Sequence, residues 1–206
     1  MGIPVLVLGR SGSGKSRSFK NFTKDELGII RVLEKELPFK NNFPPFTTSD
    51  YNKIKAVMLK SKTKSLAIDD AGYLLTDEFM RRSSEKGYDK FTELAQNFYD
   101  LIMFIATQLP REKIVYITMH EDENEITGLV KPKTIGKLLD EKVCVEGLFT
   151  IVLRCVNDGG VHKFYTNNNG CAKSPEEMFE DEEIENDLKN VDNIIRDYYN
   201  LKEENE

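Results

Sequence analysis

The chain has 206 residues, and 39% of them are hydrophobic, which is enough apolar material for one buried core. Its apolar runs are far shorter than the roughly 20 residues that a membrane-spanning helix requires, and no secretion signal is visible. Three cysteines without a CxxC pair argue against a disulfide framework and against a zinc site. Together these features predict a cytoplasmic protein with reduced thiols and no membrane partner.

Charge is unevenly distributed along the chain, although the net charge is only −6. Residues 176–206 hold thirteen acidic side chains against three basic ones, so residues 1–175 carry four positive charges in excess. Because residues 1–175 are mildly basic, the negative net charge of the whole chain does not exclude nucleic-acid binding.

The first elements alternate apolar runs with turn-forming residues. Residues 3–8 (IPVLVL) are typical of a strand buried on both faces of a parallel sheet. A glycine-rich loop follows at residues 9–16, and residues 15–22 are expected to open a helix. Residues 27–33 (LGIIRVL) predict a second strand.

Prolines and asparagines mark residues 38–48 as a loop. Ser49 or Asp50 is expected to cap a helix over residues 51–60. Residues 65–69 (SLAID) then predict a short apolar strand that ends in acids.

Apolar side chains recur at three- and four-residue steps over residues 91–105, which predicts an amphipathic helix. Residues 114–119 (IVYITM) predict another buried strand. Two further strands, at residues 148–156 and 161–166, flank the sequence Asp-Gly-Gly, which is typical of a hairpin turn.

Apolar positions from 184 to 198 predict a last amphipathic helix with an acidic outer face. Strands that alternate with helices predict an α/β fold, in which helices flank a mostly parallel, doubly wound sheet. The predicted organisation is one domain over residues 1–170 and an acidic helical tail over residues 171–206.

Residues 9–16 read GRSGSGKS and match the phosphate-binding pattern G-x-x-x-x-G-K-[ST] completely. The glycines let the backbone curl so that successive N–H groups point inward at phosphate oxygens. Lys15 is expected to contact the β- and γ-phosphates of a nucleotide, and the Ser16 hydroxyl to coordinate Mg²⁺. The predicted binding loop consists of Gly9, Arg10, Ser11, Gly12, Ser13, Gly14, Lys15 and Ser16.

Two acids end the apolar run at residues 65–69. In P-loop proteins a carboxylate at the carboxyl end of a strand holds Mg²⁺. Asp69 is predicted to be this ligand, and Asp70 to polarise the attacking water. A strand followed by an ordinary acidic turn is the alternative.

The chain resembles the phage-encoded RecA-like P-loop ATPases with an AAA-type ATP-binding domain, the phage nucleotide-binding group that includes single-strand annealing proteins. The matching segments are GRSGSGKS (9–16), SLAIDDAGYL (65–74), YITMHED (116–122), KPKTIGK (131–137) and VEGLF (145–149), of which the first is specific. The resemblance implies a RecA-like core, ATP hydrolysis in the host cytoplasm, and a role in phage DNA recombination or replication on single-stranded DNA.

The family resemblance also implies a catalytic glutamate after the second strand. Residues 31–36 read RVLEKE there, which departs from the family pattern, so the general base stays open between Glu34 and Asp70. His120, which follows the strand IVYITM, is implied to be a polar sensor of the γ-phosphate. An ordinary solvated histidine is the alternative at that position.

Lys131 and Lys133, with Lys137 and Lys142 nearby, form a modest basic cluster. They are candidates for contacts with DNA phosphates, or for a cation supplied to a neighbouring subunit's ATP in a homo-oligomer. A solubilising surface is the simpler interpretation of any single lysine. His162, in the predicted hairpin, is expected to be structural.

Two other functions compete with the DNA-linked ATPase. A nucleotide kinase shares the phosphate loop, but it needs a lid with several arginines, and arginines 81, 82, 111 and 154 do not cluster in this way. A non-hydrolysing ATP-binding assembly module would follow if no general base is present. The chain has no guanine-reading motif, which favours ATP over GTP.

Overall fold

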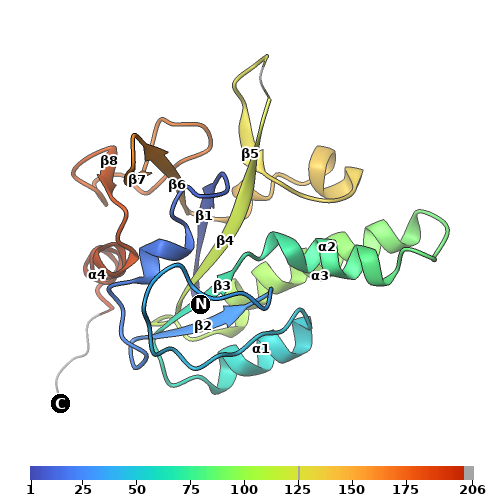
Figure 1. Ribbon diagram of the computed structural model, residues 1–206, viewed down its shortest axis with the longest axis horizontal. Coiled ribbons are helices and arrows are strands. Elements are labelled where there is room, and N and C mark those ends of the chain that lie inside the picture. The colour runs from blue at the N-terminus through green and yellow to red at the C-terminus, as the bar shows by residue number, and fades with distance from the viewer. Residues whose placement is uncertain (125, 202–206) are drawn as a thin grey trace.

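The computed structural model describes residues 1–124 and 126–201. Within these residues eight strands form one sheet, in which seven follow the order β2-β3-β4-β1-β6-β7-β8 and β5 pairs with β4 (Figure 1). Five strands run parallel, as the sequence predicts. They are β1 (Ile3–Gly9), β2 (Leu27–Arg31), β3 (Ser65–Asp69), β4 (Ile114–Glu123) and β6 (Ile151–Asp158).

Burial on both faces explains why these strands have continuous apolar sequences. All five residues of β3 are buried, and so are the last five residues of β1. β1 lies at the centre of the sheet, hydrogen-bonded to β4 on one side and to β6 on the other. The first strand in the sequence is therefore enclosed by strands that come much later.

Three antiparallel strands extend this parallel core: β5 (Val130–Pro132), β7 (Val161–Tyr165) and β8 (Glu183–Glu185). The predicted hairpin is confirmed, because β6 and β7 pair across Gly159 and Gly160, which both have positive φ. Such angles suit a two-residue hairpin turn and favour glycine. β4 runs beyond its predicted end to pair with β5, and together they form an arm that projects from the sheet (Figure 1).

Three helices cover one face of the sheet: α1 (Tyr51–Lys60), α2 (Gly72–Arg81) and α3 (Asp89–Gln108). The Asp50 side chain accepts hydrogen bonds from the N–H groups of Asn52 and Lys53, so it is the N-cap of α1. α3 confirms the predicted amphipathic helix, since Leu94, Phe98, Leu101, Ile102 and Ile105 are buried.

The opposite face is covered by α4 (Leu188–Tyr198) and by the short 3₁₀-helix η1 (Ser16–Phe19). Leu188, Val191 and Ile195 of α4 pack in the same core as Val5 and Tyr116 of the central strands. The predicted last helix began too early, because Ile184 lies in β8 and pairs with Phe164. Residues 171–206 therefore supply both a strand and a packed helix.

The helix expected over residues 15–22 is reduced to η1. The Ser18 hydroxyl donates to the carbonyl of Lys15, and the Thr23 N–H and hydroxyl both donate to the Glu26 carboxylate in a tight turn. Serine and threonine side chains that bind nearby backbone groups compete with helical hydrogen bonds. The chain thus turns quickly into β2 after the glycine-rich loop.

Two short helical segments lie between β5 and β6, the π-helical η2 (Leu138–Lys142) and the 3₁₀-helix η3 (Glu146–Leu148). Among the described residues, no helix has the length and apolarity that crossing a membrane requires.

Candidate functional site

The glycine-rich loop begins where β1 ends, at the carboxyl edge of the parallel strands. After β1 the chain crosses one face of the sheet through η1, whereas after β3 it continues into α2 on the other face. Ligands of open α/β sheets bind in the crevice at such a divergence. The fold therefore sets the loop at the position in the sheet where a ligand site is expected.

Two glycines give the loop its curvature. Gly12 and Gly14 have φ values of 77° and 109°, which disfavour residues with a side chain. A Cβ atom at Gly14 would also lie 2.6 Å from Nδ1 of His162. Among the described residues, the backbone N–H groups of Gly12, Gly14 and Lys15 have no hydrogen-bond acceptor. These N–H groups are free to bind an anion.

Lys15 folds back onto its own loop. Its Nζ atom donates to the carbonyl oxygens of Gly9 at 2.9 Å and Arg10 at 3.0 Å, and the residue is only 6% exposed. Burial lowers the pKa of Lys15, while the nearby Asp70 carboxylate acts in the opposite direction. The loop therefore concentrates positive charge beside its unpaired N–H groups.

Ser16 and Asp69 are 53 positions apart in the sequence and in direct contact. The Ser16 hydroxyl donates to Oδ1 of Asp69 at 2.8 Å, and the Thr118 hydroxyl donates to the same oxygen at 3.0 Å. Burial, and next to it the charge of Asp70, raise the pKa of Asp69. The two predicted metal ligands are thus brought together.

Asp70 has an unusual backbone and a charged partner. Its φ of 59° is in the left-handed region, and its N–H donates to the Thr118 hydroxyl at 2.7 Å. Its side chain is buried and forms an ion pair with Lys35, whose pKa is raised by this hydrogen-bonded contact. Strained backbone of this kind clusters at functional sites.

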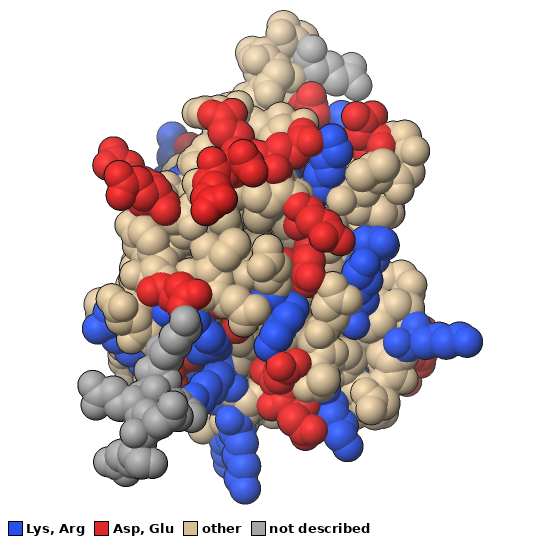
Figure 2. Space-filling view, turned by 90° about the vertical axis from the view of Figure 1, so that its left-hand side faces the viewer, with Lys and Arg blue, Asp and Glu red and all other residues tan. Residues whose placement is uncertain are grey.

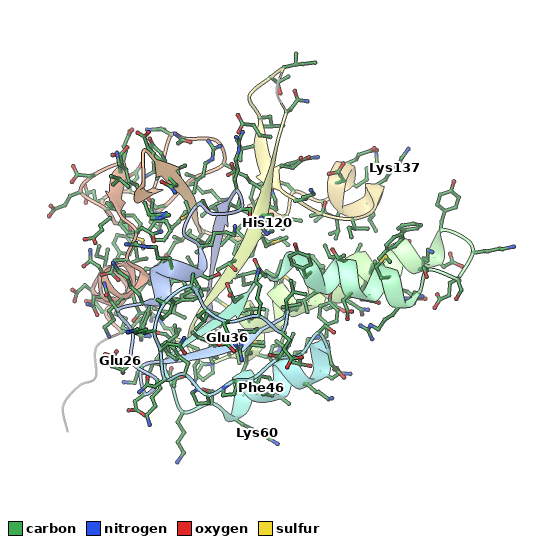
Figure 3. All side chains as sticks on the ribbon, in the orientation of Figure 1. Glu26, Glu36, Phe46, Lys60, His120 and Lys137 are labelled. Atoms are coloured by element: carbon green, nitrogen blue, oxygen red, sulfur yellow. The ribbon has the colours of Figure 1, made fainter. Side chains whose placement is uncertain are left out.

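His120 completes this group at the end of β4. Its Nε2 atom lies 3.7 Å from Oδ1 of Asp70. Burial lowers the pKa of His120, and the charges of Lys15, Lys35 and Lys133 lower it further. Figure 3 labels His120 on β4 and Glu36 on the segment that follows β2.

These side chains line a cleft of about 430 Å³, which we call the loop cleft. Its lining includes Gly14, Lys15, Ser16, Asp69, Asp70 and His120. Glu34 is exposed and lies outside the lining, whereas Lys35 and Glu36 are part of it. The structure thus gathers most of the predicted site residues around one opening, whereas Gly9, Arg10, Ser13 and Glu34 lie outside its lining.

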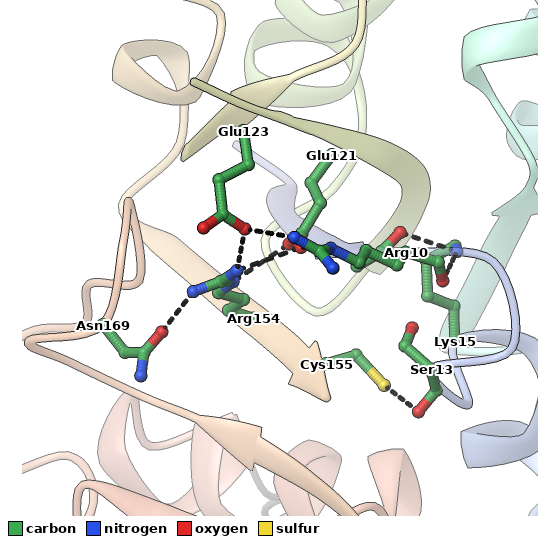
Figure 4. A network of polar contacts seen from close by, with 9 residues as sticks. Arg10, Ser13, Lys15, Glu121, Glu123, Arg154, Cys155 and Asn169 are labelled. Atoms are coloured by element: carbon green, nitrogen blue, oxygen red, sulfur yellow. Dashed lines mark hydrogen bonds and ion pairs between the residues drawn. The ribbon is translucent and has the colours of Figure 1, made fainter. Parts of the chain in front are cut away.

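The back of the glycine-rich loop rests on the C-terminal part of the sheet. The Ser13 carbonyl accepts from the Cys155 thiol at 3.1 Å and from Nδ1 of His162 at 2.7 Å (Figure 4 shows the Cys155 contact). Asn186, which is fully buried, donates to the Cys155 sulfur at 3.1 Å. Sequence patterns gave no sign of Cys155 or Asn186, and His162 was identified only as a hairpin residue.

Arg10 points away from the loop into a charge network (Figure 4). Its guanidinium donates to Glu123 at 2.8 Å. Arg154 makes two 3.0 Å hydrogen bonds to Glu121 and a third, at 3.2 Å, to Glu123. This network joins the loop to β4 and β6, and bidentate pairs of this type fix orientation well.

Within the described residues no three His, Cys, Asp or Glu side chains converge as a ready metal site. Mg²⁺ nevertheless fits the donors present, because it keeps several waters and takes one or two protein oxygens together with substrate phosphates. Ser16 and Asp69 offer such oxygens next to the unpaired loop N–H groups.

Comparisons with known proteins do not assign this chain to a family. A scan against models of protein families finds no match to this chain, and a search of curated proteins finds no relative. The candidate function therefore rests on the geometry of the loop cleft and on the residues that form it.

Proposed function

We propose that this chain is a P-loop nucleoside triphosphatase with a RecA-like core that binds ATP with Mg²⁺ in the loop cleft and hydrolyses it. The observation that carries the proposal is the 2.8 Å hydrogen bond between the Ser16 hydroxyl and Asp69. It joins the last residue of the GRSGSGKS loop to the acid that ends β3. These two residue types hold the magnesium ion of P-loop proteins.

The triphosphate would lie along the loop. The unpaired N–H groups of Gly12, Gly14 and Lys15 would bind its oxygens, and the Lys15 ammonium would exchange its contacts with the loop carbonyls for the β- and γ-phosphates. Ser16 and Asp69, the latter through water, would hold Mg²⁺, which neutralises charge on the phosphates.

Asp70 is the better candidate for polarising the attacking water. It lines the loop cleft next to Asp69, whereas Glu34 is exposed outside the lining. His120 lies beside Asp70 and is suited to sense the terminal phosphate. Asp70 must first separate from Lys35, because this ion pair occupies its carboxylate.

The biological setting that we propose is phage DNA recombination or replication, in the host cytoplasm and on single-stranded DNA. The family resemblance in five short segments suggests it, and the basic excess over residues 1–175 is compatible with it. The absence of a guanine-reading motif favours ATP among the nucleotides.

A non-hydrolysing, ATP-dependent assembly module is the second candidate. The ion pair between Lys35 and Asp70 favours it, because a carboxylate that keeps this partner cannot accept a proton from water. Binding of ATP would then act as a switch for homo-oligomer formation without turnover.

The test is ATP binding and phosphate release by purified protein, each with Mg²⁺ and with or without single-stranded DNA. Lys15→Ala is expected to lower ATP affinity about tenfold or more, since it removes a charged phosphate contact. Asp69→Asn should remove most of the Mg²⁺ dependence. Lys60→Ala is the control, because Lys60 is exposed at the end of α1, away from the loop cleft (Figure 3).

Turnover that single-stranded DNA stimulates, and that Lys15→Ala abolishes, would support the DNA-linked ATPase. Binding without turnover under both conditions would favour the assembly module. If the unmodified protein does not bind ATP, or if Lys60→Ala weakens binding as much as Lys15→Ala does, the proposed function is wrong.

A further inference from the structure

A second cleft, of about 550 Å³, adjoins the loop cleft. Both clefts include Ser11, Lys35 and His120 in their linings. The second cleft then continues between the start of α2 and the segment after β5, and its distinctive lining residues are Gly72, Tyr73, Thr76, Lys133, Thr134 and Ile135. It opens on the side of the loop cleft where Asp70 and His120 lie.

The lining of the second cleft holds more cations than acids. It contains Arg10, Lys35 and Lys133 against one acid, Glu121. Arg10 is paired with Glu121 and Glu123 and Lys35 with Asp70, so Lys133 is the lining cation that has no acidic partner in the described residues. Burial lowers the pKa of His120, and the charges of Lys15, Lys35 and Lys133 act in the same direction, against the charge of Asp70. A concave surface of one sign attracts ligands of the opposite sign.

Lys133 is distinct from the other lysines of its segment. Lys131 forms an ion pair with Asp140 at 2.6 Å, and Lys137 lies outside the second cleft. In the described part of the chain, the Lys133 ammonium has no acidic partner. Its backbone N–H donates to the His120 carbonyl at 2.8 Å, which fixes the residue next to the junction of the two clefts.

The same lining offers an aromatic ring and a hydroxyl. Tyr73 packs edge-on to His120, with ring centroids 6.0 Å apart and an interplanar angle of 84°. The Thr134 hydroxyl is buried and has no hydrogen-bond partner in the described residues. Nucleotide units are bound by cations that contact the phosphate and by aromatic rings that contact the base.

We propose that the second cleft binds a second nucleotide unit, with its phosphate on Lys133 and Lys35 and its base against Tyr73. This inference rests on the proposed function, because the unit would lie beyond the terminal phosphate of ATP. A free nucleoside monophosphate and one unit of a single nucleic-acid strand share this chemistry. Binding of a nucleic-acid strand would support the DNA-linked ATPase, whereas binding of a free nucleotide would support the kinase.

The test measures binding of a fluorescent oligo-dT and, separately, of the four deoxynucleoside monophosphates, at low salt and with the full chain. Lys133→Glu is expected to lower affinity about tenfold or more for whichever probe binds. Lys137→Glu is the matched control, since it makes the same charge change on the same segment outside the cleft. Tyr73→Leu should also weaken binding, whereas Tyr88→Leu, at an exposed tyrosine far from the cleft, should not.

ATP binding is measured on the same variants, so that the two proposals can fail separately. Probe binding that Lys133→Glu reduces and Lys137→Glu leaves unchanged supports the second cleft, and the probe that binds identifies the source of the unit. Equal losses in Lys133→Glu and Lys137→Glu, or no saturable binding of either probe, would overturn it. If ATP still binds in that case, the proposed function stands without a second site.

Discussion

Ser13 connects the glycine-rich loop to strands from the last quarter of the chain. Its carbonyl accepts hydrogen bonds from Cys155 and His162, and Asn186 in turn supports the Cys155 sulfur. A carbonyl only accepts, so Nδ1 of His162 carries the proton in this contact. Cys155 and Asn186 thus support the loop from behind, whereas His162 supports it and also lines the loop cleft.

Replacing His162 separates this supporting role from a direct role in binding. His162→Asn can offer its amide N–H near the position of Nδ1, so it is expected to retain ATP affinity. His162→Ala is expected to lower affinity several-fold, because a neutral hydrogen bond contributes about 1 kcal/mol. Equilibrium binding of ATP and amide hydrogen exchange of the loop are the measurements.

His162→Gln provides the opposite control, since its amide reaches towards the position of Nε2. Rescue by Gln and failure of Asn would show that His162 contacts the ligand directly, contrary to this expectation.

The sequence indicated part of the candidate site because some of its residues lie in short, ordered patterns. Lys15 and Ser16 belong to one continuous motif, and Asp69 ends an apolar strand. Thr118 reaches Asp69 only through the pairing of β3 with β4, and Lys35 reaches Asp70 only through the path of an irregular segment. Contacts of this type depend on tertiary structure and leave no local pattern.

At the scale of elements, α4 is fixed to the sheet by a buried polar cluster. Asp192 is 3% exposed and accepts hydrogen bonds from Ser65 at 2.5 Å and Tyr116 at 3.0 Å. Arg196, one turn later, donates to Asp192 at 2.7 Å and to the Ser65 hydroxyl at 2.8 Å. The cluster ties the last helix to β3 and β4.

Asp192→Ala is expected to reduce the free energy of unfolding by about 3 kcal/mol, because it leaves a half-buried guanidinium and a buried phenol without this acceptor. Chemical denaturation monitored by circular dichroism measures the loss. Asn193→Ala, at an exposed position on the same helix, should change the stability by less than about 0.5 kcal/mol. Similar small changes in both variants would show that the cluster contributes little to stability.

Elements with a regular repeat of apolar residues or a clear N-cap residue could be predicted from the sequence. Elements that lack both signals could not. α1 begins after the capping Asp50, and α3 repeats apolar residues over about four turns. α2 was missed because it follows directly on Asp70 and starts with Gly72, a residue unfavourable to helices. The three-residue β8 exists only because the edge of β7 is available for pairing.

At the scale of the whole molecule, two apolar cores share one sheet. Leu6 and Leu8 of β1 face α2 and α3, whereas Val5 and Val7 face η1 and α4. The C-terminal helix therefore covers a face of the same strands that carry the candidate site. Its three buried apolar side chains contribute roughly 6 kcal/mol by burial, comparable to the whole stability of a typical domain.

A chain that ends at residue 187 is expected to lose cooperative folding, since Val5, Ala67 and Tyr116 would be exposed on one face of the sheet. Thermal unfolding followed by near-ultraviolet circular dichroism, with the full chain measured in parallel, is the test. A sharp transition in the shortened chain would instead support an independent domain within residues 1–170.

Charge is also organised at this scale. Figure 2 faces the side of the molecule with β7, β8 and α4, and it shows acidic side chains gathered on the upper part of this face, with most lysines and arginines below. The second cleft begins at α2, on the other side of β1 and β4. A polyanion would be repelled from the acidic part and would meet less repulsion near the cleft.

The central position of β1 has a consequence for synthesis. β1 leaves the ribosome well before its two neighbours, β4 and β6, and the supports of its loop lie at residues 155, 162 and 186. At roughly 5–20 residues per second, the nascent chain spends on the order of ten seconds with this apolar strand unpaired. A fully supported binding loop can form only after residue 186 has been synthesised, so nucleotide cannot assist the earlier folding steps.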